Sequence, residues 1–171
     1  MLNPKVQEAL NSQFNAELYS AYLYLSMNDY FKAGSLEGFA HWMRLQAEEE
    51  LLHAMKFFDF IQQRGGRVKP AAVAAPSAEW ESPLQVFEET LKHERKVTAL
   101  INDLVRLANA ENDHATAIFL QWFVTEQVEE EESASGVLEQ LRLVGDAKSG
   151  LFMIDRELAK RPADGGDDGA A

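Results

Sequence analysis

The chain has no cysteine among its 171 residues, so disulfide bonds, thiolate metal sites and cysteine nucleophiles are all excluded. Long apolar runs are also missing, because none approaches the ~18–20 residues that a membrane span needs. The N-terminal stretch, MLNPKVQEAL, lacks the basic and apolar regions of a signal peptide. We therefore expect a cytoplasmic protein with one compact domain and no membrane partner.

Positive charge is scarce as well. The sequence has 28 acidic residues against 16 basic ones, which gives a formal net charge of −12. A surface of this sign repels nucleic acid and anionic lipid and attracts cations. We therefore expect no nucleic-acid partner, and we favour functions that involve cations.

The sequence pattern predicts an all-α protein. Asn3 followed by Pro4 is typical of a helix start, and we expect Ser35, Ser82 and Asp113 to cap three further helices. A shorter amphipathic helix follows them. The predicted helices cover approximately residues 4–34, 36–64, 83–111, 114–145 and 147–160. The predicted domain is 1–160, and the predicted acidic disordered tail is 161–171.

Residues 65–82 form an unusually long connection, with two prolines and no helical periodicity. Such a stretch can span up to ~60 Å at ~3.3 Å per residue, whereas a helix of ~30 residues is ~45 Å long. The connection can therefore run the full length of two antiparallel helical hairpins. The sequence predicts a four-helix bundle with one long crossover and a short C-terminal fifth helix.

Each long helix has a glutamate in the middle of its apolar stripe, and these residues are Glu17, Glu50, Glu94 and Glu130. The first two lie 17 and 16 residues from the turn at Gly34, and the last two each lie 18 residues from the turn at Asn112. At 1.5 Å per residue, every one of them is about 25 Å from its turn. Because the crossover places the two turns at opposite ends, the four carboxylates and His53 should meet at the middle of the bundle.

Four carboxylates cannot all stay ionised in an apolar interior without counter-ions, because desolvation and mutual repulsion raise their pKa values. Two divalent cations would balance four glutamates. Carboxylate oxygens with one imidazole suit iron or manganese better than copper, and they also accept zinc. A pair of ferrous ions supplies electrons to O2 or peroxide, whereas zinc would fill the same ligands without redox chemistry.

Other acidic residues beside the inner cluster leave two interpretations open. Glu49, Glu126 and Glu129 could bind a further cation, and an ordinary exposed helix face accounts for them almost equally well. Tyr24 lies one or two turns from Glu17 on the same helix face. We expect it to pack in the core with its hydroxyl directed at the site.

Four segments resemble prokaryotic (bacterial-type) non-haem ferritins, and the resemblance covers the chain except its tail. The segments are FNAELYSAYLYLSM, AEEELLHAMKFFDFI, LKHERKVT and FLQWFVTEQVEEE. The chain has a single Glu-x-x-His motif, from Glu50 to His53, and at the second position it has Gln127-x-x-Glu130. This asymmetry resembles ferritins proper and not bacterioferritins. Leu52 stands where bacterioferritins carry the methionine that ligates haem, so we expect no haem.

The resemblance implies a ferritin-like fold with a di-iron ferroxidase centre inside each subunit. The implied iron ligands are Glu17, Glu50, His53, Glu94 and Glu130, with Gln127 beside them. Glu50 would bridge a first iron, shared with Glu17 and His53, to a second. A third iron site is implied at Glu49, Glu126, Glu129 and Glu130. Tyr24 matches an aromatic residue near the family's centre, where it would have an electron-transfer role.

The resemblance also implies an activity and an assembly. The protein would oxidise Fe(II) with O2 or H2O2 and store ferric oxyhydroxide inside a cage of 24 identical subunits. The residues alone leave three rivals open: a cage with an inert or zinc-occupied centre, a di-iron oxygenase acting on an organic substrate, and a helical bundle without metal.

Overall fold

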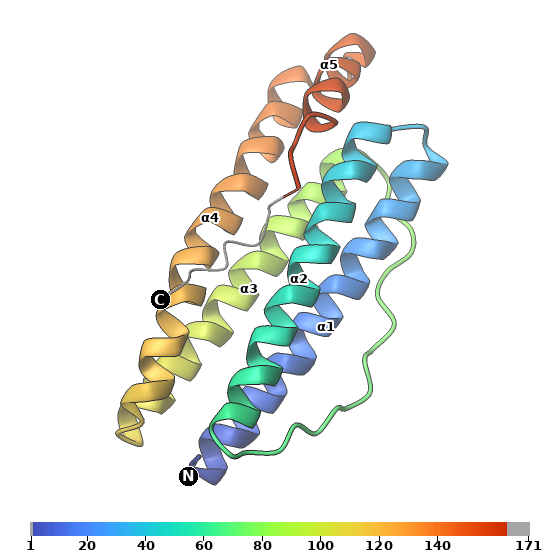
Figure 1. The fold of residues 1–171 in the computed structure, drawn as a ribbon. Coiled ribbons are helices and arrows are strands. Elements are labelled where there is room, and N and C mark those ends of the chain that lie inside the picture. Colours follow the sequence, from blue (N-terminus) through green and yellow to red (C-terminus); the bar gives the residue numbers. More distant parts are fainter. Residues whose placement is uncertain (1, 164–171) are drawn as a thin grey trace.

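The computed structural model describes residues 2–163, and five helices account for most of that range (Figure 1). Their bounds are α1 Pro4–Ala33, α2 Glu37–Gln63, α3 Pro83–Ala110, α4 His114–Val144 and α5 Lys148–Leu158. The predicted all-α fold is confirmed: α1 to α4 form the bundle, and α5 lies at the end where α1 turns into α2. Within the described residues, no helix combines the length and apolar character that crossing a bilayer requires. Most of the predicted tail, residues 164–171, lies outside the described residues.

Three of the five helices start with a side-chain capping hydrogen bond, whereas α2 and α5 do not. Asn3, Ser82 and Asp113 cap α1, α3 and α4 by accepting hydrogen bonds from backbone N–H groups in the first turn. The expected cap at Ser35 is wrong, because Ser35 adopts a left-handed conformation with φ of 58° inside the turn. Leu36 takes the capping position of α2, and its apolar side chain makes no capping hydrogen bond.

A carboxylate from α5 supplies what the start of α2 lacks. Asp155 Oδ1 accepts hydrogen bonds from the backbone N–H groups of Gly38 at 2.8 Å and Phe39 at 3.1 Å. A negative charge is favoured at this end of a helix because the free N–H groups and the helix dipole both attract it. Gly38 also permits the close approach, because a Cβ built there would lie 1.6 Å from the backbone oxygen of Asp155. The short fifth helix is therefore fixed to the second.

The crossover between α2 and α3 runs along the side of α1 (Figure 1). Side chains of α1 replace the backbone partners that an extended segment lacks: Asn11 accepts from the N–H of Lys69 at 2.6 Å and donates to the carbonyl of Arg67 at 3.1 Å. Further along, Ser26 donates to the carbonyl of Ser77 at 2.6 Å. These bonds hold the connection along most of the bundle, so α3 starts at the end opposite to the one where α2 finishes.

The hydrophobic core is divided into two clusters by a polar layer. One cluster, near α5, includes Phe31 and Phe39, whose rings stack with centroids 5.0 Å apart. The other, at the opposite end, includes Phe57 and Phe123, stacked at 4.3 Å. Each such buried aromatic side chain stabilises the fold by roughly 2–3 kcal/mol. The two clusters tolerate a buried polar layer between them because they hold the four helices together on either side of it.

Candidate metal centre

The polar layer is built by one buried glutamate from each long helix. The four carboxylates come from α1, α2, α3 and α4, and their residues are at most 5% exposed: Glu17, Glu50, Glu94 and Glu130. His53, one turn after Glu50, is 4% exposed. The fixed rise of 1.5 Å per residue brings the acids to one level, as the counting along the hairpins predicted.

Ligand atoms converge around His53 from two sides. On one side, an oxygen of Glu17, an oxygen of Glu50 and a ring nitrogen of His53 all lie within 4.8 Å of one another. On the other side, His53 forms an equally close group with Glu126 and Glu130. Nδ1 of His53 lies 3.4 Å from Glu50 Oε2, and its Nε2 lies 3.7 Å from Glu126 Oε1. The imidazole therefore lies between two sets of carboxylates.

Glu94 is held by hydrogen bonds from two neighbouring helices. The buried hydroxyl of Tyr24 donates to Glu94 Oε1, and the amide of Gln127 donates to Glu94 Oε2 at 3.2 Å. The same amide also donates to the backbone carbonyl of Glu94 at 3.2 Å. Tyr24 and Gln127 thus orient this carboxylate, and the Tyr24 hydroxyl faces the polar layer.

Burial and like charge together make this layer unfavourable for bare anions. Burial raises the pKa of Glu17 and Glu94, and it raises the pKa of Glu50 further, where repulsion by Glu17 and Glu94 adds to it. Burial and the nearby Glu94 raise the pKa of Glu130 to about 7. Burial alone would lower the pKa of His53, but contacts with Glu126 and Glu50 outweigh it and raise that pKa well above its ordinary value. The layer therefore favours positive charge, supplied by protons or by metal ions.

Two carboxylate oxygens give the layer its strongest preference for a cation. Among the described residues, Glu17 Oε2 and Glu50 Oε2 are buried and accept no hydrogen bond, and the polar contact of Glu50 Oε2 is the 3.4 Å approach of His53 Nδ1. By contrast, Glu17 Oε1 accepts from Gln13 Nε2 at 2.8 Å. Leaving a buried charged acceptor unsatisfied costs several kcal/mol. Oxygen atoms of this kind beside an imidazole match the preferences of iron, manganese and zinc. The residues present therefore fit two divalent metal ions.

Of the four acidic residues expected at a third iron site, Glu126 and Glu130 belong to the close group around His53, and Glu49 and Glu129 do not. Both oxygens of Glu49 accept from Arg161 Nη2, at 3.0 and 2.9 Å. Glu129 is exposed on α4 and belongs to neither group. The third iron site therefore stays a prediction, and in the described conformation one of its expected ligands is paired with an arginine.

Sequence reasoning missed several groups that contact the buried acids. Gln13 donates a hydrogen bond to Glu17, and Gln46 donates one to Glu130. Gln46 could have been found from the sequence, because it lies in the apolar stripe of its helix, where a buried polar side chain needs a partner. Arg161 gave no signal, because it follows the last helix and lies in the segment predicted as a tail. His93, the residue before Glu94, is half-buried, with its Nε2 2.8 Å from Ser20 Oγ. Burial lowers its pKa to about 4.

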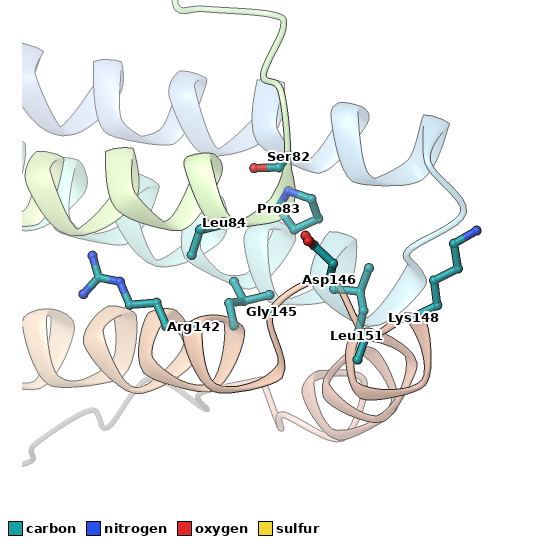
Figure 2. Close-up of a pocket in the computed structure, with 10 residues that line it drawn as sticks. Ser82, Pro83, Leu84, Arg142, Gly145, Asp146, Lys148 and Leu151 are labelled. Carbon is teal, nitrogen blue, oxygen red and sulfur yellow. The ribbon is translucent and has the colours of Figure 1, made fainter.

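A hollow elsewhere in the fold is not this site. Its volume is about 430 Å³, and it lies between the start of α3, the end of α4 and α5 (Figure 2). Its lining includes Pro83, Leu84, Leu151 and the charged residues Arg142 and Lys148, but none of the buried glutamates. The metal-binding groups lie inside the bundle and do not depend on this hollow.

Known proteins that are similar to this chain in sequence and structure are ferritins. The family model described as a ferritin-like domain matches residues 7–144. The chain is 45% identical to a bacterial non-heme ferritin of Bacteroides fragilis over 161 residues, which are 94% of this chain and 100% of that protein. It is 40% identical to the bacterial non-heme ferritin of Escherichia coli O157:H7, over 93% of this chain and 96% of the relative. The solved open pore ferritin of the archaeon Archaeoglobus fulgidus superimposes with a TM-score of 0.94 at 55% identity, over 95% of this chain and 100% of that one.

Proposed function

This chain belongs to the ferritin family, and from that premise we propose that its buried acidic layer is the centre at which two Fe(II) ions are bound and oxidised. As a ferritin, the protein stores iron and has ferroxidase activity. Iron is here the substrate and the stored cargo. We further propose which residues bind each iron, which oxidants accept the electrons and how many subunits assemble.

The first iron is bound by Glu17, Glu50 and His53. Support comes from the mutual approach of their ligand atoms within 4.8 Å. Glu50 is the natural bridge to the second iron, because its charge interacts with both Glu17 and Glu94. The second iron is bound by Glu94 and Glu130. Each of these carboxylates has one oxygen held by an amide, Glu94 Oε2 by Gln127 and Glu130 Oε2 by Gln46.

The observation that carries this proposal is the pair of buried oxygens that accept no hydrogen bond, Glu17 Oε2 and Glu50 Oε2. In a purely structural bundle, such a pair would lower the stability of every folded molecule, because each carboxyl group would have to stay desolvated as an anion or take up a proton. A cation removes that cost, and it also removes the repulsion that raises the pKa values of the neighbouring acids. Binding of Fe(II) should therefore release protons from the layer.

Oxidation needs few further groups from the protein. The two Fe(II) ions give up one electron each, and O2 accepts the two electrons with two protons to form H2O2, or H2O2 accepts them with two protons to form water. The apolar clusters above and below the layer limit the access of bulk water. Tyr24, whose hydroxyl donates to Glu94, stands beside the second iron and is placed to orient its ligand.

Storage requires many copies of the chain, and we propose the 24-subunit cage of the family. Exposed apolar side chains on α1 and α2 support contacts between subunits: Tyr22, Leu25, Leu51, Leu52 and Met55 are between 38% and 51% exposed in the single chain. Light scattering of the purified protein should give a mass near 24 times 19.2 kDa. A monomer or dimer would contradict the cage and would favour a soluble oxygenase instead.

A single-turnover experiment tests the ferroxidase assignment. Metal-free protein is loaded anaerobically with two Fe(II) per subunit, mixed with O2, and followed by the absorbance of Fe(III). We expect rapid oxidation that is blocked when Zn²⁺ is bound first, because zinc takes the same oxygen and nitrogen ligands without redox chemistry. Oxidation no faster than that of Fe(II) in buffer would leave a store with an inert centre as the better account.

A further inference from the structure

The segment that follows α5 returns to the metal centre through Arg161. This side chain is 21% exposed, and its guanidinium lies 5.0 Å from the ring centroid of Trp42 on α2. Its Nη1 donates to Gln46 Oε1 at 2.5 Å, while its Nη2 donates to both oxygens of Glu49. The backbone carbonyl of Arg161 lies 2.9 Å from His41 Nε2. These contacts fix the guanidinium against α2, next to the polar layer.

Arg161 determines which way the amide of Gln46 faces. A guanidinium can only donate hydrogen bonds, so the amide end that faces it must be the oxygen. Gln46 is completely buried, and its Nε2 then points the other way, where it donates to Glu130 Oε2 at 2.7 Å. One hydrogen bond therefore separates Arg161 from Gln46, and one more separates Gln46 from a carboxylate of the centre.

We propose that Arg161 is a positioning residue for the second iron: by fixing the amide of Gln46, it holds Oε2 of Glu130 and leaves Oε1 of that carboxylate free to bind metal. This inference rests on the proposed function, because it assigns Glu130 to the second iron. Without the guanidinium, the amide can turn and present its oxygen to an anionic carboxylate. That arrangement repels the ionised form of Glu130, which is the form that binds metal.

The docking of α5 on α2 helps to position Arg161. Asp155 holds α5 on the first turn of α2, and Gly38 leaves room for the backbone there. Arg161 lies six residues beyond Asp155, so the position of its backbone depends on that contact. The C-terminal end of the described chain thus contributes to a site whose ligands all lie on the four long helices.

Charge and positioning predict opposite signs, which makes the inference testable. The positive charge of Arg161 repels a metal cation at the centre, so its removal would strengthen metal binding if only this Coulomb repulsion mattered. Loss of a group that orients a metal ligand typically weakens metal binding by about 10–100-fold. Arg161→Gln should therefore weaken the second metal at least about tenfold and leave the first unchanged.

The experiment uses the assembled full-length protein and anaerobic titration calorimetry with Zn²⁺ and with Fe(II). Lys160→Gln is the matched control, because it removes the same charge from an exposed neighbour whose ion pair within residues 2–163 is with Glu157. Arg161→Lys keeps the charge with a single ammonium donor, and we expect it to recover part of the affinity. Gln46→Met tests the other end of the same connection, and it should weaken the second metal to a similar degree.

Two outcomes decide the question. If Arg161 acts through Gln46, the double variant should bind the second metal no more weakly than Gln46→Met alone. An unchanged or stronger second binding step in Arg161→Gln, or effects of the two substitutions that add in full, would overturn the inference. If Arg161→Gln fails to fold, wild-type affinity in a folded Gln46→Met would overturn it equally. Absence of two-metal binding in the wild-type protein would instead refute the proposed function.

Discussion

Replacing Glu130 by glutamine should stabilise the metal-free protein while it damages the metal centre. The variant keeps an oxygen that can accept the hydrogen bond from Gln46 Nε2, which now reaches Glu130 Oε2 at 2.7 Å. It removes one negative charge from a residue that is 5% exposed and lies beside Glu94. The folded state should therefore gain free energy of unfolding at any pH at which the wild-type carboxylate is ionised.

The magnitude follows from the pKa of Glu130, which burial and Glu94 raise from 4.5 to about 7. A group whose pKa is raised by folding binds more protons in the folded state, so stability falls as pH rises from the unfolded pKa to the folded pKa. At about 1.4 kcal/mol for each pH unit, the ionised carboxylate costs up to about 3 kcal/mol above pH 7. The glutamine lacks this cost, whereas near pH 4.5 the wild-type group is protonated and the two proteins should differ little.

The assay is guanidinium unfolding followed by circular dichroism, with EDTA present and with equal subunit concentrations because assembly contributes to stability. The control is Glu132→Gln, which makes the same change at an exposed position on the same helix. We expect Glu130→Gln to unfold at higher denaturant concentration than wild type at pH 8, and this gap should close toward pH 4.5. A variant that is less stable at pH 8, or a gap that does not depend on pH, would refute the electrostatic account of the layer.

Four further substitutions test the site and the docking of α5. Glu50→Ala and His53→Ala should each abolish rapid Fe(II) oxidation in stopped-flow absorbance, because each removes an iron ligand. Helix content should stay unchanged, because both variants leave the apolar clusters intact and the loss of Glu50 also relieves repulsion between carboxylates. Wild-type initial rates in both variants would contradict the ligand assignment. Tyr24→Phe removes a hydrogen bond that lowers the pKa of Glu94, so Zn²⁺ binding should weaken more at pH 6 than at pH 8 in calorimetric titrations, and an equal loss at both values would argue against this role. Gly38→Ala forces a methyl group against the backbone of α5 and should destabilise the docking of that helix by about 1–3 kcal/mol, seen as faster amide hydrogen exchange in α5; unchanged exchange would show that the contact yields easily.

The convergence of the four glutamates was predictable because helix geometry is nearly invariant. Counting from the turns at Gly34 and Asn112 needs only the rise per residue and the direction of the crossover, and it places Glu17 and Glu130 at the same level without any knowledge of side-chain packing. The same argument predicted a long connection along the bundle, since only an extended segment spans it. The structure confirms this architecture.

The contacts between helices were harder to predict than the height of each residue along its own helix. His93 is adjacent in sequence to Glu94, and one residue turns a helix by about 100°, so a small error in phase moves a side chain from the surface to a helix interface. The start of α2 depends on Asp155, which is more than 100 residues away and belongs to a different helix. Arg161 lies beyond the last helix, where no periodicity constrains its side chain. Such contacts depend on how α5 docks, which local sequence does not specify.

The most direct test of the central claim is a crystal structure of the protein soaked anaerobically with Fe(II), with iron located by its anomalous scattering. The account predicts two iron peaks inside the bundle of every subunit, one in contact with Glu17, Glu50 and His53 and the other shared by Glu50, Glu94 and Glu130. Iron found only on the outer surface, with the layer between the two apolar clusters empty of metal, would contradict it.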